Sequence, residues 1–166
     1  FLICGGVQTK VPSTWTTGGG TWATPQNVVT SDDVYATATT NGTTTTFGGF
    51  AFDPSRLLYI TQVRVGVELK GDGNDYVAVR VSGDAGTTWS EVKTASAGTS
   101  ETTRWIDYSA SFTWTAANFT STNFKVKVEK VSYPMTESNM AYIDRLVAEV
   151  KPLETTAVKD PSRVKQ

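Results

Sequence analysis

The sequence contains no histidine and only one cysteine. Without histidine, the chain lacks the commonest general base and the commonest ligand for transition metals, which argues against hydrolase triads, zinc centres and haem sites. The single cysteine, Cys4, excludes a disulfide bond within the chain. A lone thiol near a terminus is either an incidental side chain or the site of an intermolecular bridge or a lipid, and the sequence leaves these alternatives open.

Long apolar runs and an excess of one charge are also missing. No apolar segment approaches the roughly 18–20 residues that a membrane helix needs. The 15 Lys and Arg residues balance 16 Asp and Glu residues, and no basic stripe is visible, so we expect no nucleic-acid partner. No nucleophile motif, phosphate-binding loop or dinucleotide fingerprint occurs, and nothing singles out one pair of acids. The sequence therefore predicts a protein that is not an enzyme.

Threonine is abundant, together with serine, glycine and asparagine. Threonine is β-branched and suits a half-exposed strand. The sequence starts with Phe1 rather than methionine, and the removal of a leader would imply export. These features predict an extracellular or cell-surface β-protein, or alternatively a component of a virion surface. A length of 166 residues with a hydrophobic fraction of 39% favours one domain with a substantial core.

Alternating apolar residues mark the clearest strands. From Gln62 onwards, Leu57–Lys70 places valine or leucine at every second position, and Asp75–Ser82 does the same with valine. This period of two is typical of a strand with one buried face. The turn GDGN separates the two runs, so we predict an antiparallel hairpin. A third strand at Thr87–Thr94 would extend it into a meander.

Further segments show the same strand signals. The fold class predicted from them is all-β, an antiparallel β-sandwich of jelly-roll type with about eight strands. We divide the chain into an extended N-terminal segment (1–20), the sandwich (21–150) and a polar C-terminal tail (151–166). The regular charges of the strand NFKVKVEKVS (Asn123–Ser132) indicate a solvated face and protection of a sheet edge. The additional predicted strands are Asp33–Thr39, Thr43–Phe52, Glu101–Ser109, Asn123–Ser132 and Asn139–Val150.

The segment from Trp22 to Thr37 has the pattern W-x-x-P-x-N-x-x-x-S-D-D-x-Y-A-T. It is followed by FGGFAFDP (Phe47–Pro54) and ITQVRVGVELK (Ile60–Lys70), and the sandwich ends with AYIDRLVAEV (Ala141–Val150). This combination resembles jelly-roll β-sandwich modules of bacterial, archaeal and phage surface and structural proteins, including carbohydrate-binding and discoidin-like domains. The resemblance covers Trp22–Val150. It implies a sugar binder, an adhesion domain, or a virion or filament subunit.

Two adjacent acids, Asp32 and Asp33, precede a predicted strand. In the modules that this chain resembles, a structural Ca²⁺ is often held by such a loop together with an acid near the last strand, and Asp144 occupies that place. The resemblance therefore implies a calcium site formed by Asp32, Asp33 and Asp144, with loop carbonyls as further hard oxygen ligands. The alternative is that the acids only cap a turn through side-chain hydrogen bonds.

The five tryptophans offer aromatic faces that suit the apolar faces of sugars, although tryptophan in a sandwich also serves as core packing. Trp15 and Trp22 lie outside the alternating strands, so we predict that they contact a ligand or another subunit. Asn41 and Asn118 each begin an N-glycosylation sequon, a short pattern that also arises by chance in threonine-rich chains.

The main functional hypothesis is a non-enzymatic subunit that assembles into an extracellular, pilus-like filament of identical subunits. Its apolar start, with Phe1, Leu2, Ile3 and Val7 as predicted interface residues, would donate a strand to the next sandwich. A head-to-tail contact of this kind propagates into a fibre. The N-terminal segment could instead pair with its own sandwich. The alternative functions are a carbohydrate-binding or adhesion module with glycan partners, and a phage virion decoration or tail protein.

Overall fold

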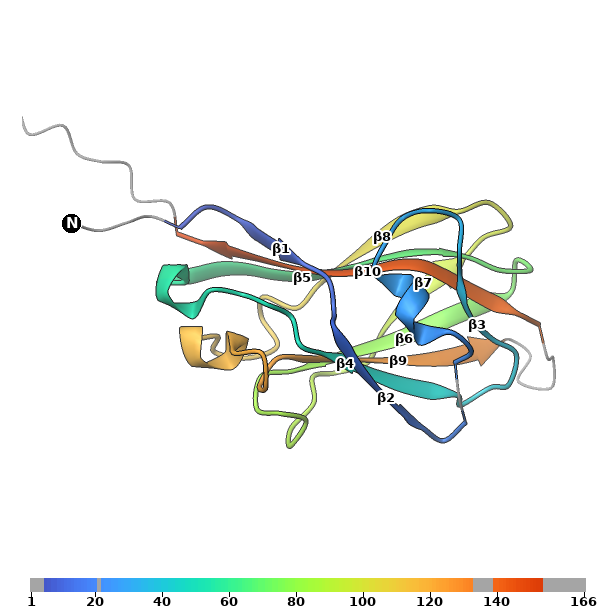
Figure 1. Cartoon of the computed structure of the whole chain (residues 1–166), viewed down its shortest axis with the longest axis horizontal. Coiled ribbons are helices and arrows are strands. Elements are labelled where there is room, and N and C mark those ends of the chain that lie inside the picture. Colours follow the sequence, from blue (N-terminus) through green and yellow to red (C-terminus); the bar gives the residue numbers. More distant parts are fainter. Residues whose placement is uncertain (1–4, 21, 133–138, 154–166) are drawn as a thin grey trace, which may run out of the picture.

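The computed structural model describes residues 5–20, 22–132 and 139–153. In this part of the chain, two antiparallel sheets face each other as a β-sandwich (Figure 1). No helix among the described residues is long and apolar enough to cross a membrane. Sheet A contains β1 (Gln8–Lys10), β3 (Ala36–Ala38), β5 (Ile60–Lys70), β8 (Thr102–Asp107) and β10 (Ala141–Pro152). Sheet B contains β2 (Thr14–Gly18), β4 (Thr44–Gly48), β6 (Asp75–Ser82), β7 (Lys93–Ala97) and β9 (Lys125–Ser132), and the 3-10 helices are η1 (Pro25–Val28), η2 (Pro54–Arg56) and η3 (Ala116–Phe119).

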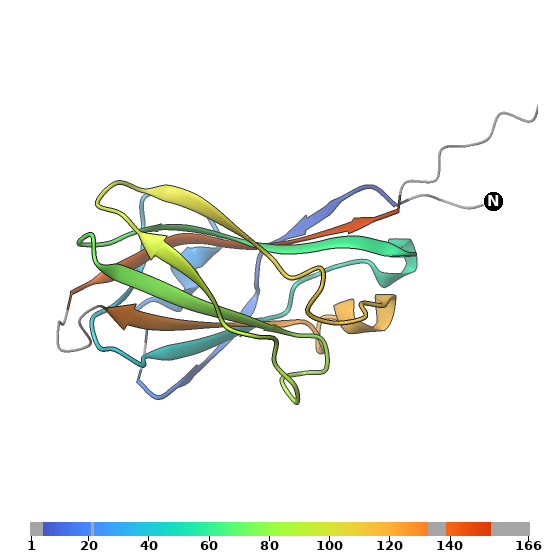
Figure 2. The same cartoon turned by 180° about the vertical axis from the view of Figure 1, so that it is seen from behind.

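The strands are connected as in a jelly roll. In sheet A, β5 lies between β10 and β8, while β1 and β3 share the other edge of β10. The order in sheet B is β2–β4–β9–β6–β7. From β3 onwards the chain changes sheet at every connection except that from β6 to β7, and Figure 2 shows the resulting two layers from behind. This arrangement confirms the predicted fold class. The strands β1 and β2 were not predicted, and they add one strand to sheet A and one to sheet B.

The core lies between the sheets and is built from the alternating positions that the sequence predicted. Each fully buried valine or leucine removes enough apolar surface from water to contribute about 1.5–3 kcal/mol. Aromatic rings close one part of the core, with neighbouring centroids 5.2–6.2 Å apart. The alternating core residues are Val63, Val65, Val67 and Leu69 on β5, Val77, Val79 and Val81 on β6, and Val126 and Val128 on β9, and the rings are Phe50, Phe52, Trp114, Phe119 and Phe124.

The predicted hairpin between β5 and β6 is wrong. β5 pairs with β10 and β8, whereas β6 pairs with β9 and β7 in the other sheet. The GDGN turn is therefore an arch across the sandwich, and the N–H of Gly71 donates to Gly98 O at 2.8 Å. Alternation shows which face of a strand is buried, but two strands that face each other across a core show the same pattern as two that pair.

Two other strand predictions need correction. The strand expected at Thr87–Thr94 begins only at Lys93, because Thr88 donates both its backbone N–H and its hydroxyl to the Asp84 carboxylate and so forms a loop. Such local side-chain bonds compete with a ladder. β9 lies between β4 and β6 rather than at an edge. Its regular charges therefore do not protect a sheet edge.

The described part of the N-terminal segment belongs to its own sandwich. β1 pairs with β10 and β2 pairs with β4 of the same chain. Phe1, Leu2, Ile3 and Cys4 lie outside the described residues, and Val7 is 47% exposed just before β1. At the other end, β10 continues to Pro152, past the predicted boundary at 150. Strand donation to a neighbouring subunit, and with it the predicted homopolymer, therefore has no support here.

Candidate functional site

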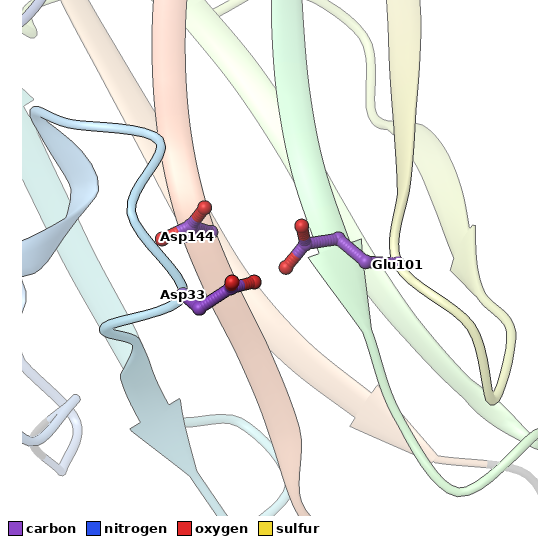
Figure 3. Close-up of side chains that lie close together, drawn as sticks. All are labelled: Asp33, Glu101 and Asp144. Carbon is purple, nitrogen blue, oxygen red and sulfur yellow. The ribbon is translucent and has the colours of Figure 1, made fainter.

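Three carboxylates from distant parts of the chain meet beside sheet A (Figure 3). Asp33 comes from the loop between η1 and β3, Glu101 directly precedes β8, and Asp144 lies in β10. One oxygen of each side chain lies within 4.8 Å of the others. The structure thus brings together two of the three predicted metal ligands and adds Glu101. Sequence alone did not single out Glu101 as a ligand, because several other acids also lie at strand ends.

A β-bulge explains how Asp144 reaches this place. The register between β10 and β5 shifts between Ile143 and Arg145, so Asp144 is the extra residue without a partner on β5. A bulge of this kind re-aims a side chain. Asp144 is 1% exposed, and its carboxylate accepts hydrogen bonds from the N–H of Asp32 at 3.1 and 3.3 Å.

The loop that carries Asp33 is fastened to the same bulge. Val29 forms an isolated β-bridge with Arg145, which anchors the start of the loop on β10. Asp33 adopts a left-handed φ of 63°, which aspartate tolerates better than most residues. The Asp32 carboxylate accepts from the N–H of Val34 at 3.2 Å. Asp32 therefore braces the turn, while its side chain stays outside the group of three carboxylates.

Tyr35 adds a hydroxyl donor to the cluster. Its OH donates to Asp33 Oδ1 at 3.1 Å. Burial, with the neighbouring Glu101 and Asp33 carboxylates, raises the pKa of Tyr35, so the phenol remains protonated. Lys70 places its ammonium 4.1 Å from the centre of the Tyr35 ring. Among the described residues, no ion pair with Lys or Arg joins the three carboxylates.

The donor set fits a hard divalent cation. Glu101 Oε2 is buried and has no hydrogen-bond partner within the described residues, a state that is costly for a carboxylate oxygen. Three carboxylates at this separation repel one another when ionised. Ca²⁺ prefers oxygen ligands of this kind and tolerates irregular geometry. Glu101, Asp33 and Asp144 would hold the ion, and its effect would be structural, because it would join the loop, β8 and β10.

A second feature is a groove on the outer face of sheet B, the face turned away from sheet A. A row of polar side chains crosses this face of the sheet, from Thr16 through Thr46 and Lys127 to Arg80. These residues are register partners on β2, β4, β9 and β6. The groove has a volume of about 420 Å³. It is lined by Thr14, Thr16, Thr46, Ala85, Gly86, Trp89, Lys125 and Lys127.

The Asp84 carboxylate holds the loop that positions Trp89. It accepts from the Thr88 hydroxyl at 2.6 Å and from the Thr88 N–H and the Ser82 hydroxyl, both at 2.8 Å. These bonds, led by those from Thr88, lower the pKa of Asp84 to about 2. Gly86 has a φ of 90°, and a Cβ atom there would lie 3.3 Å from the Trp89 ring. The glycine therefore allows the loop to pass close beside the indole.

A smaller hollow on the outer face of sheet A contains Trp105. It has a volume of about 200 Å³, and the side chain of Trp105 is 44% exposed. The Arg64 guanidinium covers the ring at 4.1 Å from its centre and is itself held by Glu149 at 2.7 Å. That ion pair fixes the arginine over one face of the indole.

The two predicted contact tryptophans have different places. Trp22 is 1% exposed and packs in the core, where its Nε1–H donates to Thr43 O at 3.1 Å. The prediction that it contacts a ligand or subunit is therefore wrong. Trp22 lies outside the regular strands, but the next residue, Ala23, forms a β-bridge with Thr37 of β3, which fastens this segment to sheet A. Trp15 is 38% exposed on β2. It does not line the groove on sheet B.

Both sequon asparagines are built into the fold. Asn118 donates from Nδ2 to Gly83 O at 3.0 Å and accepts from the N–H of Thr115, which caps η3. The Oδ1 of Asn41 accepts from the N–H of Ser132 at 2.6 Å. Glycosylation at either residue stays a prediction, and at Asn118 it would have to replace the bond made by Nδ2.

No protein-family model and no curated protein matches the sequence. Solved structures do match. A truncated AlyQ chain with CBM32 and alginate lyase domains has a TM-score of 0.56 and 13% identity, over 89% of this chain. This chain spans 34% of the length of that one. The likeness shows the fold, and at that level it confirms the resemblance to jelly-roll carbohydrate-binding modules.

Two further structures have lower scores. TmCBM61 in complex with beta-1,4-galactotriose has a TM-score of 0.44 and 15% identity, covering 82% of this chain and 88% of that one. The CBM22-1 xylan-binding domain from Paenibacillus barcinonensis Xyn10C has a TM-score of 0.49 and 10% identity, covering 91% and 98%. Both TM-scores lie below 0.5.

Proposed function

We propose that this domain is a non-catalytic carbohydrate-binding module, and that it takes a glycan with acidic groups into the groove on the outer face of sheet B. The observation that carries the proposal is the groove itself, where one partly exposed indole lies beside threonine hydroxyls and lysine ammonium groups. An extracellular or cell-surface location goes with this function. The alternative that the sequence left open, a sugar binder rather than a filament subunit, thus becomes the main proposal.

The groove has the components that sugar recognition needs. An indole offers a flat apolar face for the C–H groups of a pyranose ring. The hydroxyls of Thr14, Thr16 and Thr46 supply donors and acceptors along the same wall. The Lys127 ammonium lies 4.2 Å from the centre of the Trp89 ring. Since no ion pair holds this lysine among the described residues, it is free to move aside or to bind a ligand anion.

The positive charge around the groove favours an acidic glycan over a neutral one. Arg80 is exposed opposite Lys127, and Lys125 lies two residues along the same strand. These three cations outnumber Glu129, the one acid on this face of β9, and they attract carboxylate or sulfate groups although the whole chain has a net charge of −1. A neutral sugar would accept hydrogen bonds from these groups but would gain no charge attraction. Uronic acids and sulfated sugars therefore suit the groove better than neutral glucans do.

We also propose that Asp33, Glu101 and Asp144 bind Ca²⁺. The support is the buried, unpartnered Glu101 oxygen and the approach of three carboxylates from three separate segments. The ion would brace the fold at the edge of sheet A. The glycan groove lies on the outer face of sheet B, so calcium would stabilise the scaffold rather than contact the sugar.

Affinity electrophoresis tests the glycan proposal directly. Native gels would contain either polygalacturonic acid or a neutral β-glucan, and the wild-type protein should be retarded only in the acidic gel. Trp89→Ala should lose this retardation. Trp105→Ala is the matched control, because it removes an exposed tryptophan from the opposite sheet, and it should migrate like the wild type.

Three results would count against the proposal. Equal retardation in both gels would remove the acidic preference. A loss of binding in Trp105→Ala but not in Trp89→Ala would place the site on sheet A. Migration unchanged by any acidic or neutral polysaccharide, in protein whose fold is verified by circular dichroism, would exclude the groove as a glycan site.

A further inference from the structure

Sheet B carries a lysine and an aspartate on its inner face, and neither reaches solvent. Lys130 on β9 and Asp75 on β6 are both 0% exposed, and Lys130 Nζ lies 3.2 Å from Asp75 Oδ1. Alternation along β9 places Lys130 inward, in line with Val126 and Val128. Lysine and aspartate are almost never fully buried unless they are paired. A buried ion pair is often no more stabilising than an apolar pair of the same size, so fold stability alone does not explain it.

A carboxamide completes the group. Asn41 Oδ1 lies 3.4 Å from Lys130 Nζ and accepts from the N–H of Ser132 at 2.6 Å. The Ser132 hydroxyl donates to Asp75 Oδ1 at 2.6 Å and also contacts Lys130 Nζ. The N–H of Asp72 donates to Asp75 Oδ2 at 3.1 Å. An amine, a carboxamide and a carboxyl group therefore meet in one place, where the amine and the carboxyl group are fully buried and Asn41 is half-buried.

The backbone holds these groups in register. The N–H of Gly42 donates to Lys130 O at 2.9 Å, and the N–H of Lys130 donates to Thr43 O at 3.0 Å. Trp22 donates from its indole to the same Thr43 carbonyl and is 1% exposed. Reacting groups that are held in contact and away from water need no further loss of freedom to react.

We propose that the side chains of Lys130 and Asn41 form an intramolecular isopeptide bond, and that the Asp75 carboxylate transfers the protons in this reaction. The bond would link β9 to the residues just before β4. It would give a covalent brace to a chain that cannot form a disulfide within itself, because it has one cysteine. This inference is independent of glycan binding and of calcium.

The reaction balances without any other reagent. The Lys130 ammonium gives one proton to Asp75, and the neutral amine then attacks Asn41 Cγ to form the new C–N bond. The N–H of Ser132, already bonded to Oδ1, stabilises the charge that develops on this oxygen. The bond from Cγ to Nδ2 then breaks, and Nδ2 leaves as ammonia after Asp75 returns protons to it. Overall, an ammonium and a carboxamide become a secondary amide and an ammonium ion.

The contacts favour Asn41 over Asp75 as the acyl donor. If Asp75 itself were the acyl donor, its carboxyl group would be consumed, and no other carboxyl group among the described residues would remain beside Lys130 to transfer protons. Burial on its own would raise the pKa of Asp75, but the bonds from Ser132, Asp72 and Lys130 outweigh it and hold the pKa below its ordinary value. The resting state is therefore the ion pair, and we expect a slow reaction that occurs once, after folding.

A competing reaction is disfavoured by the same geometry. Asn–Gly sequences form a succinimide when the glycine nitrogen attacks the asparagine side chain. Here the Gly42 N–H is bonded to Lys130 O, which holds the nitrogen away from this attack. Both products lack one ammonia, so mass alone cannot distinguish them, and the peptide connection must be established.

The test is mass spectrometry of the whole denatured chain, followed by trypsin digestion. The wild-type protein should be lighter than its sequence by one ammonia. Digestion should release a branched peptide that joins residues 11–56 to residues 128–145, with no cleavage after Lys130. Lys130→Met, Asp75→Asn and Asn41→Ala should each have the full sequence mass. Asn118→Ala is the control, because it removes the other sequon asparagine, and it should still lose one ammonia.

Several outcomes would overturn the proposal. They are the full sequence mass in folded wild-type protein after prolonged incubation, the loss of one ammonia without a branched peptide, and the loss of one water with a link from Lys130 to Asp75. If a variant fails to fold, the wild-type mass and the branched peptide still decide the matter, since neither depends on a variant.

Discussion

Lys127 lies over the Trp89 indole at 4.2 Å from the ring centre, on the outer face of sheet B. Lys127→Glu would remove the cation and place a negative charge against an acidic ligand. We expect a roughly tenfold or larger rise in Kd for an acidic oligosaccharide at low salt, which corresponds to about 1.4 kcal/mol. Isothermal titration calorimetry at several salt concentrations would measure it, because charge contacts weaken as salt increases.

Lys10→Glu is the matched control for this prediction. It makes the same change in net charge on β1, in the opposite sheet. An equal loss of affinity in both variants would show that net charge, rather than the groove, controls binding.

The sequence predicted which residues are buried better than it predicted which strands pair. Val65 and Val79 were placed correctly, because the period of two depends only on which face of each strand meets the core. The pairing of β5 with β6 was wrong, because the GDGN turn accommodates a hairpin and an arch equally well. The pairing depends on strands far away in the sequence, β10 and β8 for β5 and β9 and β7 for β6, and the Gly71 bond to Gly98 likewise joins the turn to a residue outside it.

The residues of the candidate sites were also predicted only in part. Asp33 and Asp144 were predicted through a family resemblance, but Glu101 was not, because only the fold brings the start of β8 to the bulge in β10. Trp22 and Trp89 could not be separated by sequence. A loop position suggested exposure for Trp22, whereas burial is decided by where that loop lies against the sandwich.

The loop that carries Trp89 should respond to acid. Because the folded-state pKa of Asp84 is lowered to about 2 from 3.8, this carboxylate contributes stability that is complete above the ordinary pKa. The contribution is lost as pH falls from about 4 to about 2. The protection of the loop amides against hydrogen exchange, expressed relative to the intrinsic exchange rate at each pH, should fall over this range, and Asp84→Asn should show the lower protection already at pH 7. Exchange that is unchanged in Asp84→Asn would mean that the carboxylate does not hold the loop.

Glu101→Gln should have opposite effects with and without calcium. With a chelator present, it removes one of three mutually repelling charges, so the midpoint of thermal unfolding should stay the same or rise. With Ca²⁺ present, it removes a ligand, so the midpoint should fall below that of the wild type. Glu129→Gln on β9 serves as the control and should shift both midpoints equally. Wild-type unfolding that is insensitive to calcium would remove the metal site.

Trp22→Ala should act on stability rather than on recognition. The side chain is 1% exposed and its indole N–H is bonded to Thr43 O, so truncation leaves a cavity and removes one of the two hydrogen bonds that this carbonyl accepts. Replacing a large buried aromatic residue by alanine typically costs about 3–5 kcal/mol. Denaturant unfolding should show a loss of this size, whereas Trp15→Ala, at an exposed position on an edge strand, should cost far less. If Trp22→Ala kept wild-type stability and yet abolished glycan binding, the indole would be a ligand contact, and its place in the core would be wrong.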